Sequence, residues 1–285
     1  ICSVSTSIFL PTPLPSPYLP SQPPPPAVRV RRLRKEFPCP ATGGSTLALE
    51  SLDLDIPVGL VTALLGHNGA GKTTTLQILT GMTAATSGAA SINGFDIATQ
   101  MKEVRKCLGV CPQFDVLWPT ITVADHLKLY ASIKGYRGAY EEGRAAREAA
   151  RAVGLEAQWN VPAGDLSGGQ RRKLSVAIAM MGEPAVVFLD EPTSGMDPYS
   201  RRATWELIRT QRKKSSVMFT THSMEEADLL ADHIIIMSQG RVAAEGSPLE
   251  LKRRFGAGYS LTFVMLDKAA ADAPEDAVAG GGGGG

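Results

Sequence analysis

Two glycine-rich stretches of the chain have the residue types of loops that bind phosphate. The first, GHNGAGKTTT, starts at Gly66, and the second, LSGGQRRKLSVAIA, starts at Leu166. Glycine allows consecutive backbone N–H groups to point toward an anion, and a helix that begins after the loop adds positive potential. The sequence therefore predicts two phosphate-facing helix starts in one chain.

The first stretch satisfies the pattern G-x-x-x-x-G-K-[ST]. It follows an apolar run, LVTALLG, that predicts a buried strand, and it precedes a segment with helical character. In this context Lys72 can reach the β- and γ-phosphates of a nucleotide, and the Thr73 hydroxyl can bind Mg²⁺. We name this stretch the phosphate loop and expect ATP to contact these residues: Gly66, His67, Asn68, Gly69, Ala70, Gly71, Lys72, Thr73 and Thr74.

A pair of acids stands at the end of a second apolar run, VVFLDEP. Asp190 is suited to hold Mg²⁺ through water, and the adjacent Glu191, pointing another way, is suited to polarise the attacking water. A buried strand can also end in acids that have no catalytic role. The combination of two acids, the turn at Pro192 and a phosphate loop favours nucleotide hydrolysis.

Two further polar residues follow apolar strands. Gln113 follows the short run in GVCPQFD, and His222 closes VMFTTH. At the carboxyl edge of a parallel sheet both would face the γ-phosphate or its metal. The alternative, that each is an ordinary loop residue, stays open on these residues alone.

The composition is that of an ordinary globular protein: 285 residues, 44% hydrophobic, 20% charged, with a formal net charge of +1. A near-neutral chain is not expected to bind nucleic acid, which usually requires a basic excess. The four cysteines form no C-x-x-C pair, and we interpret them as buried or unused thiols. Because the sequence begins with Ile1 rather than Met, we expect a piece of a longer protein.

The patterning predicts three regions. Residues 1–26 are rich in proline and predict an extended linker, with an SH3 or WW ligand as the alternative; residues 267–285, acidic and then all glycine, predict a disordered tail. Between them, residues 27–266 predict one α/β domain. Strands are expected at 51–56, 60–66, 185–190, 216–222 and 233–238, with a hairpin turn at Asn93-Gly94.

The expected fold is a P-loop NTPase of the RecA-like type. Its core is a mainly parallel sheet, because strands alternate with helices, and a small antiparallel part accompanies it. Residues of about 120–182 have helical patterning and are expected to form an inserted helical subdomain. Thr122 is its predicted N-cap, with Asp125 three residues later.

With these pieces in order, the chain resembles the nucleotide-binding domain of ATP-binding-cassette transporters over about residues 28–264. The resemblance identifies GHNGAGKT as Walker A, VVFLD followed by Glu191 as Walker B, and LSGGQ as the signature motif. It assigns Gln113 to the Q-loop, SGMD at 194–197 to the D-loop and His222 to the switch histidine. Phe37 falls where the family has an adenine-stacking aromatic residue, and a plain hydrophobic anchor is the alternative.

The finer resemblance is to the A subfamily, whose full-length members are lipid transporters. It rests on segments such as CPQFDVLWPTITVADHLKLYA and DEPTSGMDPYSRRATWELI, and PYSRR and EADLLAD are more similar to the first cassette than to the second. Gln170 departs from the subfamily, which often has another residue there. This departure bears on the subfamily and not on the ATP chemistry.

The resemblance also explains the second glycine-rich stretch. It implies that two cassettes pair head to tail, so that Ser167, Gly168, Gly169 and Gln170 contact a nucleotide held by a second nucleotide-binding domain. Asp197 would connect the two sites. Lys72, Gln113, Glu191 and His222 are the implied catalytic residues, and Thr73, Gln113 and Asp190 the implied Mg²⁺ site.

The resemblance implies an ATPase that powers substrate transport by transmembrane domains, at the cytoplasmic face of a membrane. The subfamily implies a lipid as the substrate. In FDVLWP, Phe114 and Trp118 are interpreted either as a docking surface for those domains or as core.

One alternative function is a soluble cassette ATPase that acts on ribosomes or DNA. The near-neutral charge and the short separation of Lys72 from Asp190, which leaves no room for a very long coiled coil, disfavour it. The other alternative is a regulator that binds nucleotide without hydrolysing it.

Overall fold

A computed structural model of the chain describes residues 25–39, 44–212 and 214–256. Apart from residues 25 and 26, the predicted linker at 1–26 lies outside the described residues. The predicted tail at 267–285 and the last ten residues of the predicted folded unit, 257–266, also lie outside them.

The centre of the fold is a six-stranded sheet that carries the predicted nucleotide-binding residues. Its strand order is β10-β9-β3-β8-β7-β6, and every neighbouring pair except β10 and β9 is parallel. The strands β3, β7 and β8 are buried at every position, because helices or a second sheet cover both faces. This sheet confirms the predicted mainly parallel core. Its strands are β3 (Val61–Leu65), β6 (Leu108–Cys111), β7 (Val186–Asp190), β8 (Ser216–Thr221), β9 (His233–Ser238) and β10 (Arg241–Gly246).

An antiparallel sheet of four strands packs beside the first, in the order β2-β1-β4-β5. Asn93 and Gly94 both have positive φ and form the predicted two-residue turn between Ile92 and Phe95. The sequence did not predict β1, because a register shift at Arg32, where φ is 46°, breaks its apolar alternation. The strands are β1 (Val28–Cys39), β2 (Gly44–Ile56), β4 (Ser87–Ile92) and β5 (Phe95–Asp96).

Two hydrophobic cores lie on the two faces of the six-stranded sheet. On one face, Phe188 and Leu64 pack with Leu79 of α1 and with the antiparallel sheet. On the other face, Phe219 and Val187 pack against helices α5, α6 and α7. The helices around the sheet are α1 (Lys72–Leu79), α2 (Met101–Cys107), α6 (Pro198–Gln211), α7 (Met224–Leu230) and α8 (Pro248–Phe255).

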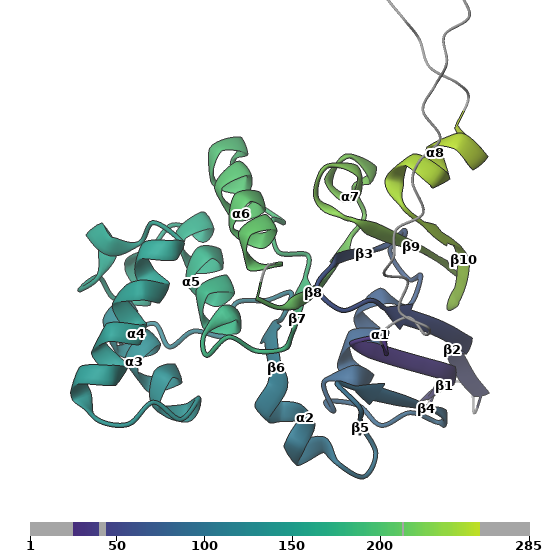
Figure 1. Cartoon of the computed structure of the whole chain (residues 1–285), viewed down its shortest axis with the longest axis horizontal. Coiled ribbons are helices and arrows are strands. Elements are labelled where there is room, and N and C mark those ends of the chain that lie inside the picture. Colours follow the sequence, from purple (N-terminus) through teal and green to yellow (C-terminus); the bar gives the residue numbers. More distant parts are fainter. Residues whose placement is uncertain (1–24, 40–43, 213, 257–285) are drawn as a thin grey trace, which may run out of the picture.

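A group of helices is inserted between β6 and β7 and lies to one side of both sheets (Figure 1). It has a core of its own, in which Leu127 and Ala146 pack with Leu174. Thr122 caps its first helix by accepting the Asp125 N–H at 3.1 Å, as predicted. The inserted elements are α3 (Val123–Ile133), α4 (Ala139–Ala152), α5 (Gly168–Met180) and the short 3₁₀ helices η1 (Glu156–Gln158) and η2 (Ala163–Asp165).

None of the helices in the described ranges is long and apolar enough to cross a bilayer.

Candidate nucleotide-binding site

The residues predicted to bind and hydrolyse the nucleotide meet at the carboxyl edge of the six-stranded sheet. Gly66 follows β3, Asp190 ends β7 and His222 follows β8, and these three strands are neighbours. The register pairs Leu65 with Thr221 and Asp190 with Thr220, so the strands end at the same level. A strand-to-helix turn, two acids and a histidine are therefore brought together from parts of the chain that are far apart in sequence.

Two glycines of the phosphate loop are required by close packing. A Cβ atom on Gly66 would lie 2.6 Å from the Met237 carbonyl oxygen. Gly71 has a φ of 102°, and a Cβ atom there would lie 2.7 Å from Leu49 Cδ2. Both positions exclude a side chain, which lets the loop turn tightly from β3 into α1. The intervening residues His67, Asn68 and Gly69 are exposed, where a ligand can reach their backbone.

Lys72 lies inside the curve of this loop. Its Nζ donates to the carbonyl oxygens of Gly66 at 2.7 Å and of His67 at 3.1 Å. Burial lowers the pKa of Lys72, and the carboxylates of Glu191 and Asp190 oppose that shift. The ammonium group is thus held next to the loop backbone and the two acids, at the place where a nucleotide phosphate would need a positive charge.

Two hydroxyl groups lie against the Asp190 carboxylate, one from helix α1 and one from the neighbouring strand β8. The Thr73 hydroxyl lies 3.4 Å from Asp190 Oδ1, and the Thr220 hydroxyl donates to the same oxygen at 2.5 Å. Thr220 Oγ1 also accepts the Glu191 N–H at 2.9 Å. The sequence analysis missed Thr220, although a threonine in the buried run VMFTT, two residues before His222, was the available signal.

The donor set near Asp190 fits Mg²⁺. Mg²⁺ usually keeps several waters and binds one or two protein oxygens together with substrate phosphates. Asp190 and Thr73 supply such oxygens, and within the described ranges no group of three or more His, Cys, Asp or Glu side chains could form an all-protein metal cage. The arrangement therefore suits an ion that arrives with a nucleotide.

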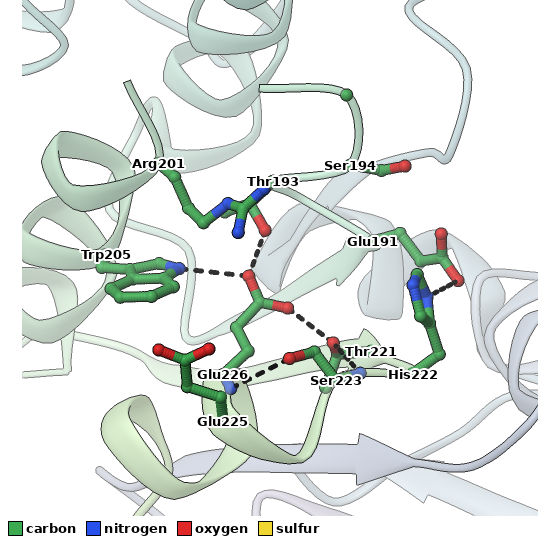
Figure 2. A pocket seen from close by; sticks show the side chains of 11 residues that line it. Glu191, Thr193, Ser194, Arg201, Trp205, Thr221, His222, Ser223, Glu225 and Glu226 are labelled. Carbon is green, nitrogen blue, oxygen red and sulfur yellow. Dashed lines mark hydrogen bonds and ion pairs between the residues drawn. The ribbon is translucent and has the colours of Figure 1, made fainter. Parts of the chain in front are cut away.

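Glu191 has a left-handed backbone conformation, with a φ of 47°. Non-glycine residues rarely adopt this conformation, and it costs on the order of 1 kcal/mol. It separates the two acids, since the Asp190 carboxylate faces the threonines while Glu191 Oε1 lies 3.3 Å from His222 Nδ1. Figure 2 shows the Glu191 and His222 side chains pointing toward each other at one end of a cavity of about 160 Å³.

A buried carboxylate, Glu226, also lines that cavity, and Figure 2 shows it between Trp205 and Thr221. Its Oε1 accepts from Trp205 Nε1 at 3.1 Å and from the Thr193 hydroxyl, and its Oε2 accepts from the Thr221 hydroxyl at 2.5 Å. These bonds join α6, the turn after Glu191, the end of β8 and α7. The sequence analysis missed Glu226, which is one of several acids in MEEADLLAD and has no pattern of its own.

The second glycine-rich loop, Leu166–Gln170, forms an N-terminal capping box on α5. Ser167 Oγ accepts the Gln170 N–H at 3.2 Å, and the Gln170 side chain accepts the Ser167 N–H at 2.9 Å. Ser167 and Gly168 are exposed. The N-terminus of α5 is therefore at the surface. It lies beside the start of α6, because a Cβ atom on Gly169 would be 3.4 Å from Ser200 Oγ.

Asp197 caps α6 at this junction. Its Oδ1 accepts the Ser200 N–H at 2.9 Å, and this bond lowers the pKa of Asp197. Its Oδ2 faces Gly169, where an added Cβ would be 3.7 Å away. The residues that the sequence analysis assigned to the signature motif and the D-loop are therefore neighbours within one chain.

Four predicted aromatic and amide residues lie at the surface. Gln113 is exposed in the loop after β6, at the same sheet edge as Asp190. Phe37 on β1 is 37% exposed, with Lys35 Nζ 4.8 Å from its ring centre. Phe114 and Trp118 are 79% and 49% exposed, which contradicts the interpretation of these two residues as core.

Comparison with known proteins agrees with this geometry. Residues 49–194, slightly more than half of the chain, match the family described as ABC transporter. The chain belongs to the ABC transporter family. The matched range includes the phosphate loop, the second glycine-rich loop and the two acids at the end of β7.

Curated relatives of the cassette belong to the A subfamily, which confirms the predicted resemblance. ABC transporter A family member 6 of Dictyostelium discoideum is 48% identical over 236 residues, covering 82% of this chain and 14% of the relative. The human phospholipid-transporting ATPase ABCA3 is 46% identical over 239 residues, covering 83% of this chain and 14% of the relative. The chain therefore spans about one seventh of the length of these relatives.

The fold of the cassette is also that of solved ABC structures. A structure of the ATP-binding subunit of an ABC transporter aligns with a TM-score of 0.71 and 30% identity, covering 81% of this chain and 93% of the other. This similarity confirms the predicted P-loop NTPase fold.

Proposed function

We propose that the chain is the ATP-binding and ATP-hydrolysing cassette of a transporter, that it dimerises on ATP, and that it powers lipid transport by associated transmembrane domains. The observation that carries the proposal is the meeting of Lys72, Asp190 and Glu191 at the edge of one sheet. A phosphate-binding loop beside one carboxylate for a metal and another for water is what phosphoryl transfer to water requires.

The phosphate loop binds ATP. Its backbone N–H groups and the N-terminus of α1 bind the phosphates, and Lys72 exchanges its carbonyl partners for β- and γ-phosphate oxygens. Mg²⁺ would be held by Thr73, Asp190 and Gln113. When bound, Mg²⁺ neutralises charge that builds up on the phosphates. Phe37 stacks on the adenine.

Glu191 acts on the attacking water. Glu191 accepts a hydrogen bond from the water and orients the water toward the γ-phosphate. His222 holds the γ-phosphate and stays in contact with Glu191. The left-handed backbone at Glu191 directs its carboxylate to this position, away from the metal-binding Asp190. Lys72 stabilises the charge of the transferring phosphoryl group.

The second glycine-rich loop binds the nucleotide of a partner cassette. Ser167 and Gly168 are exposed at the start of α5 and Gly169 is half-buried. Their N–H groups would contact a γ-phosphate held by another copy or another cassette of the parent protein. Gln170 fixes the conformation of Ser167 through the capping box, and Asp197, whose Oδ2 faces Gly169, would help connect the two nucleotide sites.

The transported substrate and the membrane partner follow from the relatives. The human relative is named a phospholipid-transporting ATPase, which supports a lipid as the substrate of the parent protein. The exposed Phe114 and Trp118 offer an apolar surface beside Gln113 for transmembrane domains. The cassette would then work at the cytoplasmic face of the membrane, where ATP is available.

The substitution Glu191→Gln tests the proposed reaction. It preserves the shape of the side chain and removes its ability to accept a proton, so we expect ATP turnover to fall by about 10²-fold or more, while binding of a fluorescent ATP analogue is retained. The matched control is Glu206→Gln, which makes the same change on an exposed face of α6 and should leave turnover unchanged. Unchanged turnover in Glu191→Gln would contradict the hydrolytic role and favour a nucleotide-binding regulator.

A further inference from the structure

Arg172 is a buried cation that the proposed mechanism does not use. It lies in the first two turns of α5 and is 4% exposed. A buried guanidinium is costly unless its N–H groups are hydrogen-bonded. Arg172 meets this condition almost entirely through backbone carbonyl groups from two segments distant from α5.

The first segment is the turn that contains Glu191. Arg172 donates to three consecutive carbonyl oxygens: that of Asp190, that of Glu191 at 3.0 Å and that of Pro192 at 3.2 Å. Successive carbonyls of an extended strand point to opposite sides, so three of them can converge on one group only where the chain turns. The turn here is the left-handed conformation of Glu191.

The second segment is the loop after β6. Arg172 donates to the carbonyl oxygens of Pro112 at 2.5 Å and Gln113 at 3.2 Å, and it forms an ion pair with Asp115 at 3.2 Å. Asp115 also accepts from the Ser175 hydroxyl of α5 at 2.8 Å. One guanidinium therefore joins α5 to the loop that carries Gln113 and to the turn that carries Glu191.

Only a planar fork of N–H groups can make these contacts together. Arginine has five N–H donors directed along fixed lines, whereas lysine has three donors on one nitrogen atom. A left-handed non-glycine residue persists only where its surroundings fix it. In the described part of the chain, two other hydrogen bonds hold the Glu191 backbone. The Glu191 N–H donates to Thr220 Oγ1 at 2.9 Å, and the Ser194 N–H donates to the Glu191 carbonyl oxygen at 3.1 Å.

We propose that Arg172 is a positioning residue for ATP hydrolysis. It holds the three carbonyls around Glu191, and so keeps the Glu191 carboxylate beside His222 and aimed at the attacking water. It acts through Glu191 of its own chain and touches neither the nucleotide nor the metal. This inference rests on the proposed function of Glu191.

The substitution Arg172→Lys tests the inference in the full chain. It keeps the charge and removes the planar guanidinium, so we expect kcat for ATP to fall by about tenfold or more because the water-activating group is displaced. The KM for ATP should stay within about twofold of wild type, and a cooperative thermal transition should show that the chain is folded. Arg202→Lys is the matched control, because it makes the same substitution at an exposed position of α6. A wild-type kcat would overturn the inference, and so would a folded variant whose KM for ATP rises as much as its kcat falls.

A mixed-dimer experiment separates positioning of Glu191 from a general structural effect. A Glu191→Gln chain and a Ser167→Arg chain should each be inactive alone. When they are mixed, one active site forms from Glu191 of the second chain and the glycine-rich loop of the first. Arg172→Lys in the chain that supplies Glu191 should lower this restored turnover by about tenfold, and Arg172→Lys in the other chain by less than twofold. Equal losses in both arms would overturn the inference.

If Arg172→Lys does not fold, a second variant tests whether Arg172 positions Glu191. Asp115→Asn keeps the side-chain shape and an acceptor oxygen and removes the ionic partner of Arg172. A kcat about threefold lower at unchanged KM would support the inference, and an unchanged kcat would overturn it. A wild-type chain that did not hydrolyse ATP would refute the proposed function. An active wild-type chain with an equally active Arg172→Lys variant would refute only the role of Arg172.

Discussion

The hydroxyl of Thr73 lies 3.4 Å from Oδ1 of Asp190, although 117 residues separate the two positions in the chain. Thr73 is in the first turn of α1, and Asp190 is the last residue of β7. Packing of α1 against the six-stranded sheet brings them together, and this contact places side by side the hydroxyl and the carboxylate that we propose as Mg²⁺ ligands. The geometry of the site therefore depends on groups that orient Asp190 from behind.

Thr220 is such a group. Valine has nearly the same volume as threonine but no hydroxyl, so Thr220→Val removes the donor to Asp190 and leaves the buried Glu191 N–H without its acceptor. We expect the free energy of unfolding to fall by about 2 kcal/mol and ATP turnover to fall with it. Urea titration and steady-state ATPase measurements check this, and Thr220→Ser, which keeps the hydroxyl, should retain most of both quantities.

Glu226 is a buried carboxylate that joins the segments around the site, and its two possible replacements should behave differently. Glu226→Ala leaves Trp205 Nε1 and the hydroxyls of Thr193 and Thr221 without their acceptor and opens a cavity, so unfolding should become easier by about 3 kcal/mol. In Glu226→Gln the amide oxygen can accept from Trp205, while the amide N–H₂ donates to Thr221, whose hydroxyl can rotate to accept.

Differential scanning calorimetry of the two Glu226 variants distinguishes these outcomes. Glu226→Gln should lie much closer to wild type than Glu226→Ala. An equal loss in the two variants would show that the negative charge, and not the pattern of acceptors, stabilises this network.

Gly66 is predicted to tolerate no side chain. Gly66→Ala places a Cβ 2.6 Å from the backbone carbonyl oxygen of Met237, and such overpacking costs about 1–3 kcal/mol. Because the phosphate loop must shift to relieve the clash, affinity for a fluorescent ATP analogue should also fall. The control is Gly143→Ala in α4, where the added Cβ meets nothing within 4 Å and should raise stability by up to about 1 kcal/mol.

The pKa of Lys72 predicts a pH dependence of stability without nucleotide. Burial lowers this pKa below its ordinary value of 10.5. Between the folded-state pKa and 10.5 the unfolded chain binds the Lys72 proton more tightly, so the contribution of Lys72 to the free energy of unfolding rises with pH. Lys72→Met lacks this contribution.

Urea unfolding at a series of pH values measures the difference in stability between Lys72→Met and wild type. The difference, variant minus wild type, should become smaller as the pH rises from about 8 toward the ordinary lysine pKa. A difference that does not change with pH would contradict burial as the dominant influence on Lys72. A fluorescent ATP analogue should bind Lys72→Met weakly at every pH, because the variant lacks the charge that faces the phosphates.

The sequence by itself determined the features that depend on neighbouring residues. The phosphate loop, the acids after β7, the Asn93-Gly94 turn and the Thr122 cap are each contained in a few consecutive residues whose backbone preferences and spacing suffice. The mainly parallel core followed from alternating apolar runs and helices. The strand β1 was not predictable in this way, because the register shift at Arg32 removes its alternation and only pairing with β2 and β4 identifies it.

The tertiary structure alone decided how the proposed catalytic residues are held. Arg172 is 60 residues from Pro112 in sequence, and Glu226 is 33 residues from Thr193, so no local pattern relates them. The left-handed backbone at Glu191 is likewise unfavourable for a glutamate taken alone. Burial decides these features, because a charged or polar group removed from water must find its hydrogen-bond partners wherever the fold brings them.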